Sequence, residues 1–215
     1  MKCYYNIKYP YLNYSYTDTD GNYIMFSVPP IMLIEEYKAH FQCEPKTFFD
    51  CGAAVGMIVR LAIDYGMDAR GIDVKNYPQQ QQSFSRLKHK DKLYTVPIFM
   101  LQELFTNGRI EIKSVLDCNT INADIAYCNG TLTYFDEKTL PYVLSKFKKV
   151  GMLCAIHNTT EDVIAAQQMG ETLGTCNTTR TIKPNDWWIE TFYKNGFDAK
   201  LNTQLRTFIA VPRQK

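Results

Sequence analysis

Short apolar runs alternate with amphipathic segments from residue 47 onward, and this alternation constrains the fold more than any other feature. Helical spacing of apolar residues predicts helices at 55–65 and 140–149, and a further helix capped by Asn185. Strands that alternate with helices form a mostly parallel sheet with helices on both faces. We therefore predict an open α/β fold around a seven-stranded sheet. The expected strands are 47–51, 69–74, 110–116, 123–128, 152–156, 198–201 and 207–211.

Two segments fall outside this pattern. Residues 1–45 begin rich in tyrosine and become helical after Pro30, which predicts an N-terminal arm and helix packed on a core of residues 46–215. Residues 75–108, between the second and third strands, exceed what one crossover needs and predict an insertion. Within it, 96–105 has helical character, and the basic run 86–92 is typical of a solvated helix face or loop.

Composition narrows the class of protein. Hydrophobic residues make up 46% of the chain and charged residues 21%, and these fractions are typical of globular proteins. The formal net charge of +2 gives no general attraction to nucleic acid, so nucleic acid is a possible but not a favoured partner. The seven cysteines form no CxxC pair, which predicts reduced thiols and no metal site. Without an apolar run of roughly 20 residues or a signal peptide, we expect a soluble, cytoplasmic protein with no membrane partner.

The loop after the first expected strand reads Asp-Cys-Gly-Ala-Ala-Val-Gly over residues 50–56. In an open α/β sheet this loop is where a ligand binds. Gly52 and Gly56 permit a sharp turn and close approach of the backbone to the ligand. Asp50 would repel a pyrophosphate but suits a ligand that carries an ammonium group. Asp73, at the end of the second strand, can accept hydrogen bonds from both hydroxyls of a ribose.

These two segments resemble the first motifs of class I S-adenosylmethionine-dependent methyltransferases, and the resemblance extends over roughly residues 46–212. Ala54 stands where the family has its central glycine. The resemblance implies a Rossmann-like fold, S-adenosylmethionine as cofactor, Asp50 facing its amino group and Asp73 binding its ribose. The residues that it assigns to the cofactor are Asp50, Cys51, Gly52, Ala53, Ala54, Gly56, Asp73, Val74, Asp117, Cys118 and Asn129.

Two of these assignments depend on shorter matches. Asp117 and Cys118 follow the third expected strand, where the family places an acid against the adenine amino group; Asp124 and Asn119 are alternatives for this role. Asn129 begins an Asn-Gly-Thr-Leu segment that, by the same resemblance, faces the cofactor.

Catalytic residues are harder to predict, because methyl transfer can depend mainly on positioning the donor and acceptor. His157, directly after the fifth expected strand, is the candidate general base, since an imidazole titrates near neutral pH. The alternative is a histidine that only hydrogen-bonds its own loop. Glu161 and Asp162 follow it, and they either orient His157 or cap the next helix.

The resemblance implies an enzyme that methylates a small molecule or a protein side chain. Residues 129–132 lack the (D/N)-P-P-(Y/F/W) sequence of the family's nucleic-acid amino-methyltransferases, and the chain has no Pro-Cys dipeptide for cytosine C5 chemistry. Two alternatives stay open. One is a non-catalytic, methyltransferase-like binding module, and the other is an RNA or DNA methyltransferase that grips phosphates with the basic run 86–92.

Overall fold

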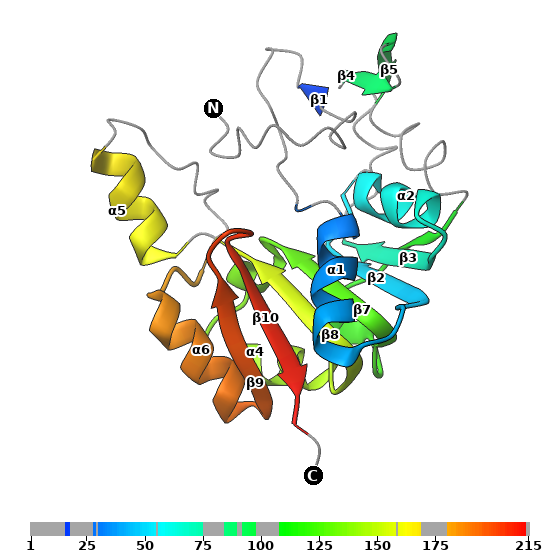
Figure 1. Ribbon diagram of the computed structural model, residues 1–215. Helices are drawn as coiled ribbons and strands as arrows, with labels where there is room; N and C mark the ends of the chain where they lie inside the picture. Colours follow the sequence, from blue (N-terminus) through cyan, green and yellow to red (C-terminus); the bar gives the residue numbers. More distant parts are fainter. Residues whose placement is uncertain are drawn as a thin grey trace.

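Seven strands of the computed structural model form one large sheet, shown in Figure 1. The structure describes residues 16–17, 28, 30–54, 56–74, 84–89, 92–97, 108–157, 159–168 and 180–213. The strands of the large sheet are β2 (Thr47–Cys51), β3 (Asp68–Asp73), β6 (Ile110–Ile112), β7 (Asn122–Asn129), β8 (Lys149–Ile156), β9 (Phe197–Asn202) and β10 (Thr207–Pro212).

The order of these strands is β6-β3-β2-β7-β8-β10-β9. β10 runs antiparallel to β8 and β9, whereas the other neighbouring pairs are parallel. The prediction of an open, mostly parallel α/β sheet of seven strands is confirmed.

Helices cover both faces of the sheet. One face packs against α1 (Pro30–Phe41) and α2 (Met57–Asp64), whose buried side chains include Leu33 and Val59. The other face packs against α4 (Leu140–Ser145) and α6 (Asn185–Lys194), whose buried side chains include Leu144 and Trp188. Each helix contributes residues three or four apart to a single buried face, as an amphipathic helix on a sheet must.

Three predicted boundaries are corrected. The third strand, expected to continue to residue 116, ends at Ile112, because the Ser114 side chain accepts the Leu116 N–H and starts a short 3-10 helix, η2 (Val115–Asp117). The helix expected at 140–149 ends at Ser145 as α4. Asn185 is the first residue of α6 and not its cap, which is Pro184.

The N-terminal arm and the insertion together form a second, three-stranded sheet. Its order is β1 (Tyr16–Thr17), β4 (Phe84–His89) and β5 (Lys92–Pro97), with both pairs antiparallel. Residues 86–89 and 92 of the basic run therefore lie on two paired strands rather than on a helix face. The helix expected at 96–105 is wrong at its first two residues, which end β5, and its remaining residues lie outside the described part of the chain. The small sheet lies above α2 in the view of Figure 1.

Candidate functional site

The strand order reverses beside β2, and this is where the predicted site residues meet. The chain passes from β2 to β3 on one side and later returns to β7 on the other side of β2. In open α/β sheets such a reversal opens a crevice at the carboxyl ends of the strands. Loop 50–56, Asp73 and Asn129 all lie at this edge, because each stands at or after the end of its strand.

The glycine-rich loop folds back onto the end of β3. The N–H groups of Gly52 and Ala53 both donate to the carbonyl oxygen of Ile72, at 2.9 and 3.0 Å. The N–H of Ala54 donates to the Asp73 carboxylate at 2.7 Å. Gly52 has a φ of +90° and Ala54 a φ of +48°, so the loop uses the left-handed region twice within three residues. The loop is thus held in one shape by β3.

Two buried carboxyl groups lie side by side at this point. Asp50 and Asp73 are only 3% and 8% exposed, and the register pairs Asp50 with Gly71, two residues before Asp73. Burial, and secondarily the charge of Asp73, raise the pKa of Asp50 to about 8. A cation placed against Asp50 would stabilise its carboxylate form. The two carboxyl groups therefore suit a ligand that presents an ammonium group to Asp50 and a hydrogen-bond donor near Asp73 of β3.

Solved methyltransferases share this architecture, although no family model matches the sequence and no curated protein matches it either. The small RNA methyltransferase HEN1 superimposes with a TM-score of 0.57 at 12% identity, over 89% of this chain and 27% of HEN1. The sugar N-methyltransferase KedS8 from a Streptoalloteichus species gives 0.61 at 12% identity, over 88% of this chain and 89% of its own. The plantazolicin methyltransferase BpumL, solved with SAH, gives 0.58 at 8% identity, over 84% and 82%.

The fold is that of the class I methyltransferases. At these identities the likeness establishes the fold alone. This chain spans about a quarter of the length of HEN1 but most of the length of KedS8 and BpumL.

The other predicted cofactor residues of this methyltransferase fold differ in exposure. Cys51 and Ala53 are buried, and the thiols of Cys51 and Cys128 hydrogen-bond across β2 and β7, which together with burial raises the pKa of Cys51. Cys118 is half-buried, and burial raises its pKa. Val74 is 68% exposed at the mouth of the site.

Of the acids offered for the adenine amino group, Asp117 is exposed on η2 and its role stays a prediction. Asp124, the alternative to Asp117, lies at the wrong end of its strand for this role. Its carboxylate accepts the N–H groups of Lys46 and Thr47, at 2.7 and 2.9 Å, near the amino end of β7. That end of the strand is opposite the glycine-rich loop. Asp124 therefore joins β2 to β7 and cannot face the crevice at the carboxyl ends of the strands.

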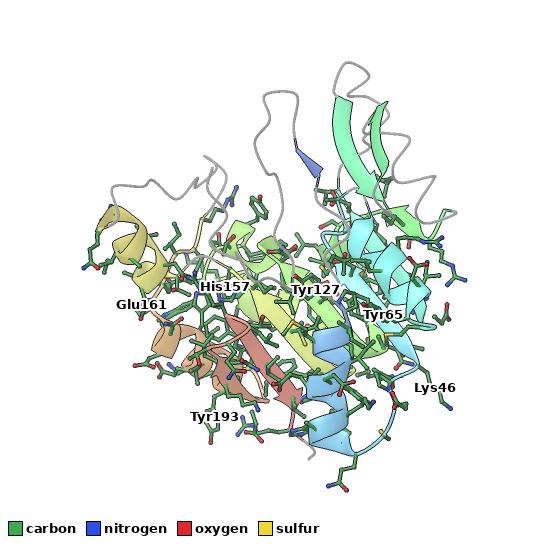
Figure 2. All side chains as sticks on the ribbon, turned by 45° about the horizontal axis from the view of Figure 1, so that its top comes forward. Lys46, Tyr65, Tyr127, His157, Glu161 and Tyr193 are labelled. Atoms are coloured by element: carbon green, nitrogen blue, oxygen red, sulfur yellow. The ribbon has the colours of Figure 1, made fainter. Side chains whose placement is uncertain are left out.

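His157 has surroundings that do not suit the general base expected from the sequence. Its ring stacks on Phe208 at 4.7 Å between centroids and contacts Trp188 at 3.8 Å. Neither ring nitrogen has a hydrogen-bond partner among the described residues, so the described part of the loop does not support the alternative of a histidine bonded to its own loop. Burial lowers the pKa of His157 to about 3. Figure 2 shows His157 and Tyr127 at a similar height, toward the upper edge of the sheet.

Glu161 and Asp162 cap helices and do not orient His157. Asp162 accepts the N–H and hydroxyl of Thr159, both at 3.0 Å, at the start of α5 (Thr160–Gln168). Glu161 accepts the N–H of Asn185 at 3.1 Å, at the start of α6. Carboxylates at helix N-termini stabilise the first turn.

Thr131 belongs to the Asn-Gly-Thr-Leu segment that the resemblance places facing the cofactor, and the structure adds a contact that was not predicted for it. It begins the short 3-10 helix η3 (Thr131–Tyr134), and its hydroxyl donates to the carbonyl oxygen of Cys51 at 2.6 Å. No local sequence signal indicates this bond, because it joins residues that are 80 positions apart. Among the described residues no three His, Cys, Asp or Glu side chains converge as metal ligands, and none of the described helices could cross a bilayer.

Proposed function

We propose that this chain is an S-adenosylmethionine-dependent methyltransferase whose cofactor lies across the carboxyl ends of β2, β3 and β7. The observation that carries the proposal is the pair of buried carboxyl groups, Asp50 and Asp73, at the point where the strand order reverses. A fold that had lost its cofactor would gain little from burying the Asp50 carboxyl group beside Asp73, because a buried carboxylate is costly unless a cation compensates its charge.

The residues present fit this cofactor in charge and in hydrogen-bonding character. Asp50 would accept hydrogen bonds from the amino group of the methionine part, and the backbone of Gly52, Ala53, Ala54 and Gly56 would line that part. Beside the loop, Asp73 and Val74 would lie at the ribose, Asp117 and Cys118 at the adenine, and Asn129 near the reacting carbon. The ends of β2, β3 and β7, together with η2, would thus supply groups to one elongated ligand.

The cofactor, when bound, supplies a methyl group on a sulfonium centre. The protein's part is to align that carbon with the acceptor and to exclude water, which can provide much of the rate enhancement without a general base. We assign no base to His157, because its nitrogens are buried and its pKa is low. The acceptor that we propose is a small molecule or a protein side chain.

Ligand binding tests this proposal directly. Calorimetry should detect S-adenosylmethionine and S-adenosylhomocysteine but not NAD. Asp73→Ala should weaken binding of both by about 1.5–3 kcal/mol, the range for losing hydrogen bonds to a charged group. Asp73→Asn is the matched variant, because its amide oxygen can still accept the Ala54 N–H and preserve the loop. Binding of NAD without either methionine-derived ligand would overturn the proposal.

The two alternative functions are separated by one further assay. Labelled S-adenosylmethionine should be incubated with the protein and with metabolite, protein and RNA fractions of a lysate. We expect label in metabolites or protein. Label in RNA would instead favour a nucleic-acid methyltransferase, and the basic residues of β4 and β5 would be the first to mutate. Cofactor binding with no transfer to any fraction would favour a binding module.

A further inference from the structure

We propose that Thr131 is a positioning residue that sets the shape of the glycine-rich loop for the methionine part of the cofactor. This inference rests on the proposed function and deepens it. Thr131 lies 80 residues from Cys51 in the sequence, yet its hydroxyl donates to the Cys51 carbonyl oxygen at 2.6 Å. Cys51 is the last residue of β2, so the bond fixes the point at which the loop departs from the strand.

The same side chain also rests on Gly52. A Cβ atom built on Gly52 would overlap the Thr131 hydroxyl oxygen, so no larger residue fits there without moving Thr131. Thr131 therefore makes two contacts with consecutive loop residues, one with the carbonyl of Cys51 and one with the Cα of Gly52.

Thr131 is itself held rigidly from the far side. Gly130, with a φ of +72°, donates its N–H to the Ile156 carbonyl of β8 at 2.6 Å. Thr133 donates its hydroxyl to the Gly130 carbonyl at 2.7 Å, and the side chain of Leu132, which precedes Thr133 in the sequence, is buried. A turn anchored to β8 in this way holds the Thr131 hydroxyl in place with little freedom to adapt.

The loop is consequently held at two points with different neighbours. The Ala54 N–H binds Asp73, on the side where the ribose would lie. The Cys51 carbonyl and Gly52 bind Thr131, on the side of β7. Residues in the left-handed region persist only where the surroundings hold them. Loss of the Thr131 contacts should therefore relax the start of the loop while Asp73 and the nucleoside half of the site stay as they are.

Calorimetry with two probes tests this inference. S-adenosylhomocysteine carries the amino acid part, and 5′-methylthioadenosine lacks it. Thr131→Ala should weaken S-adenosylhomocysteine about tenfold, the effect of losing a hydrogen bond together with its packing, and should change methylthioadenosine less than about twofold. Thr131→Ser retains the hydroxyl and should recover most of the affinity. Ser145→Ala is the control, since it removes another hydroxyl that donates to a carbonyl, that of Tyr142 at 2.6 Å, at the end of α4 and near the amino end of β8.

The outcomes separate this inference from the proposed function. If the unsubstituted protein binds S-adenosylhomocysteine and Thr131→Ala binds it equally well, this inference alone is overturned. An equal loss of both probes together with early thermal unfolding would show a general structural role and would also overturn it. If the unsubstituted protein binds neither probe, the proposed function fails, and the inference fails with it.

Discussion

The carboxyl group of Asp50 is almost fully buried beside Asp73, and burial is the main cause that raises its pKa to about 8. At pH 7 the free protein therefore holds a proton on Asp50, whereas a bound ammonium group requires the carboxylate. Ligand binding must then release this proton. We expect the affinity for S-adenosylhomocysteine to rise with pH between 6 and 7.5, at close to tenfold per pH unit.

Calorimetry in buffers of different ionisation enthalpy measures this release, which should approach one proton per ligand at pH 7. The control is Asp50→Asn, which should bind weakly and show no pH dependence in this range. Affinity in the unsubstituted protein that stays constant from pH 6 to 7.5 would mean that Asp50 does not meet the ammonium group.

A second prediction concerns His157, whose pKa is lowered by burial, whereas the pKa of Asp50 is raised. Burial lowers the pKa of His157 from 6.5 to about 3, so the unfolded chain takes up a proton before the folded protein does. Its contribution to stability is therefore complete above pH 6.5 and is lost as the pH falls toward 3. Relative to His157→Phe, the protein should lose about 1 kcal/mol per pH unit between pH 6 and 4.

Urea unfolding of both proteins at several pH values measures this loss. At pH 7.5 His157→Phe should be at least as stable as the unsubstituted protein. It removes two buried nitrogens that have no partner in the described part of the chain, and it retains a ring between Trp188 and Phe208. A strongly destabilised phenylalanine variant would show that the nitrogens do have a partner in solution.

At the scale of elements, α5 is joined to the rest of the fold chiefly by side chains at its first turn. Asp162 accepts hydrogen bonds from Thr159 and forms an ion pair with Arg206 in the turn between β9 and β10. Glu161 binds the start of α6, and the Thr160 N–H donates to the Lys183 carbonyl at 3.1 Å. None of these bonds reaches the glycine-rich loop.

We therefore expect Asp162→Ala to loosen α5 by about 1–2 kcal/mol, the usual cost of removing a helix cap. Amide hydrogen exchange should speed up in α5 and stay unchanged in β7 and β8. Asp198→Ala is the matched surface control, because its contact with Arg213 is an exposed ion pair at 4.0 Å and should matter little. Equal acceleration across the sheet would show that α5 is part of one cooperative unit with it.

At the scale of the whole molecule, the arm and the insertion meet in the small sheet through the pairing of β1 with β4. Binding residues often lie on such added segments, held by a rigid core. Deletion of residues 1–26 should leave the affinity for S-adenosylhomocysteine within a few-fold, because Asp50, Asp73 and Thr131 belong to the large sheet and its loops. Transfer to the acceptor found in the lysate assay should fall sharply.

Cofactor titration and thermal melting on the same truncated protein test this expectation. The truncation keeps Val28, whose N–H donates to the Tyr127 hydroxyl at 3.2 Å, so the approach to α1 is preserved. Early melting or aggregation would show that the arm mainly covers apolar surface. Full activity of a soluble truncation would show that the arm has no part in acceptor binding.

The sequence by itself determined the fold class and the core of the candidate site. Apolar periodicity depends on neighbours within one element, and it located β2 and β3 within one residue. Two acids and two glycines at fixed spacing sufficed to place Asp50, Gly52, Gly56 and Asp73 together, since strand ends in a parallel sheet meet at one edge.

Only the tertiary structure decided the roles that depend on distant neighbours. His157 has the same local sequence whether it faces a substrate or packs against Trp188 and Phe208, and those rings come from elements 31 and 51 residues away. Likewise, Thr131 acquires its contact with Cys51 only when β2 and β7 pair. The pairing of β1 with β4 follows the same rule. Periodicity reports which face of an element is buried, whereas the partner buried against it is fixed by long-range packing alone.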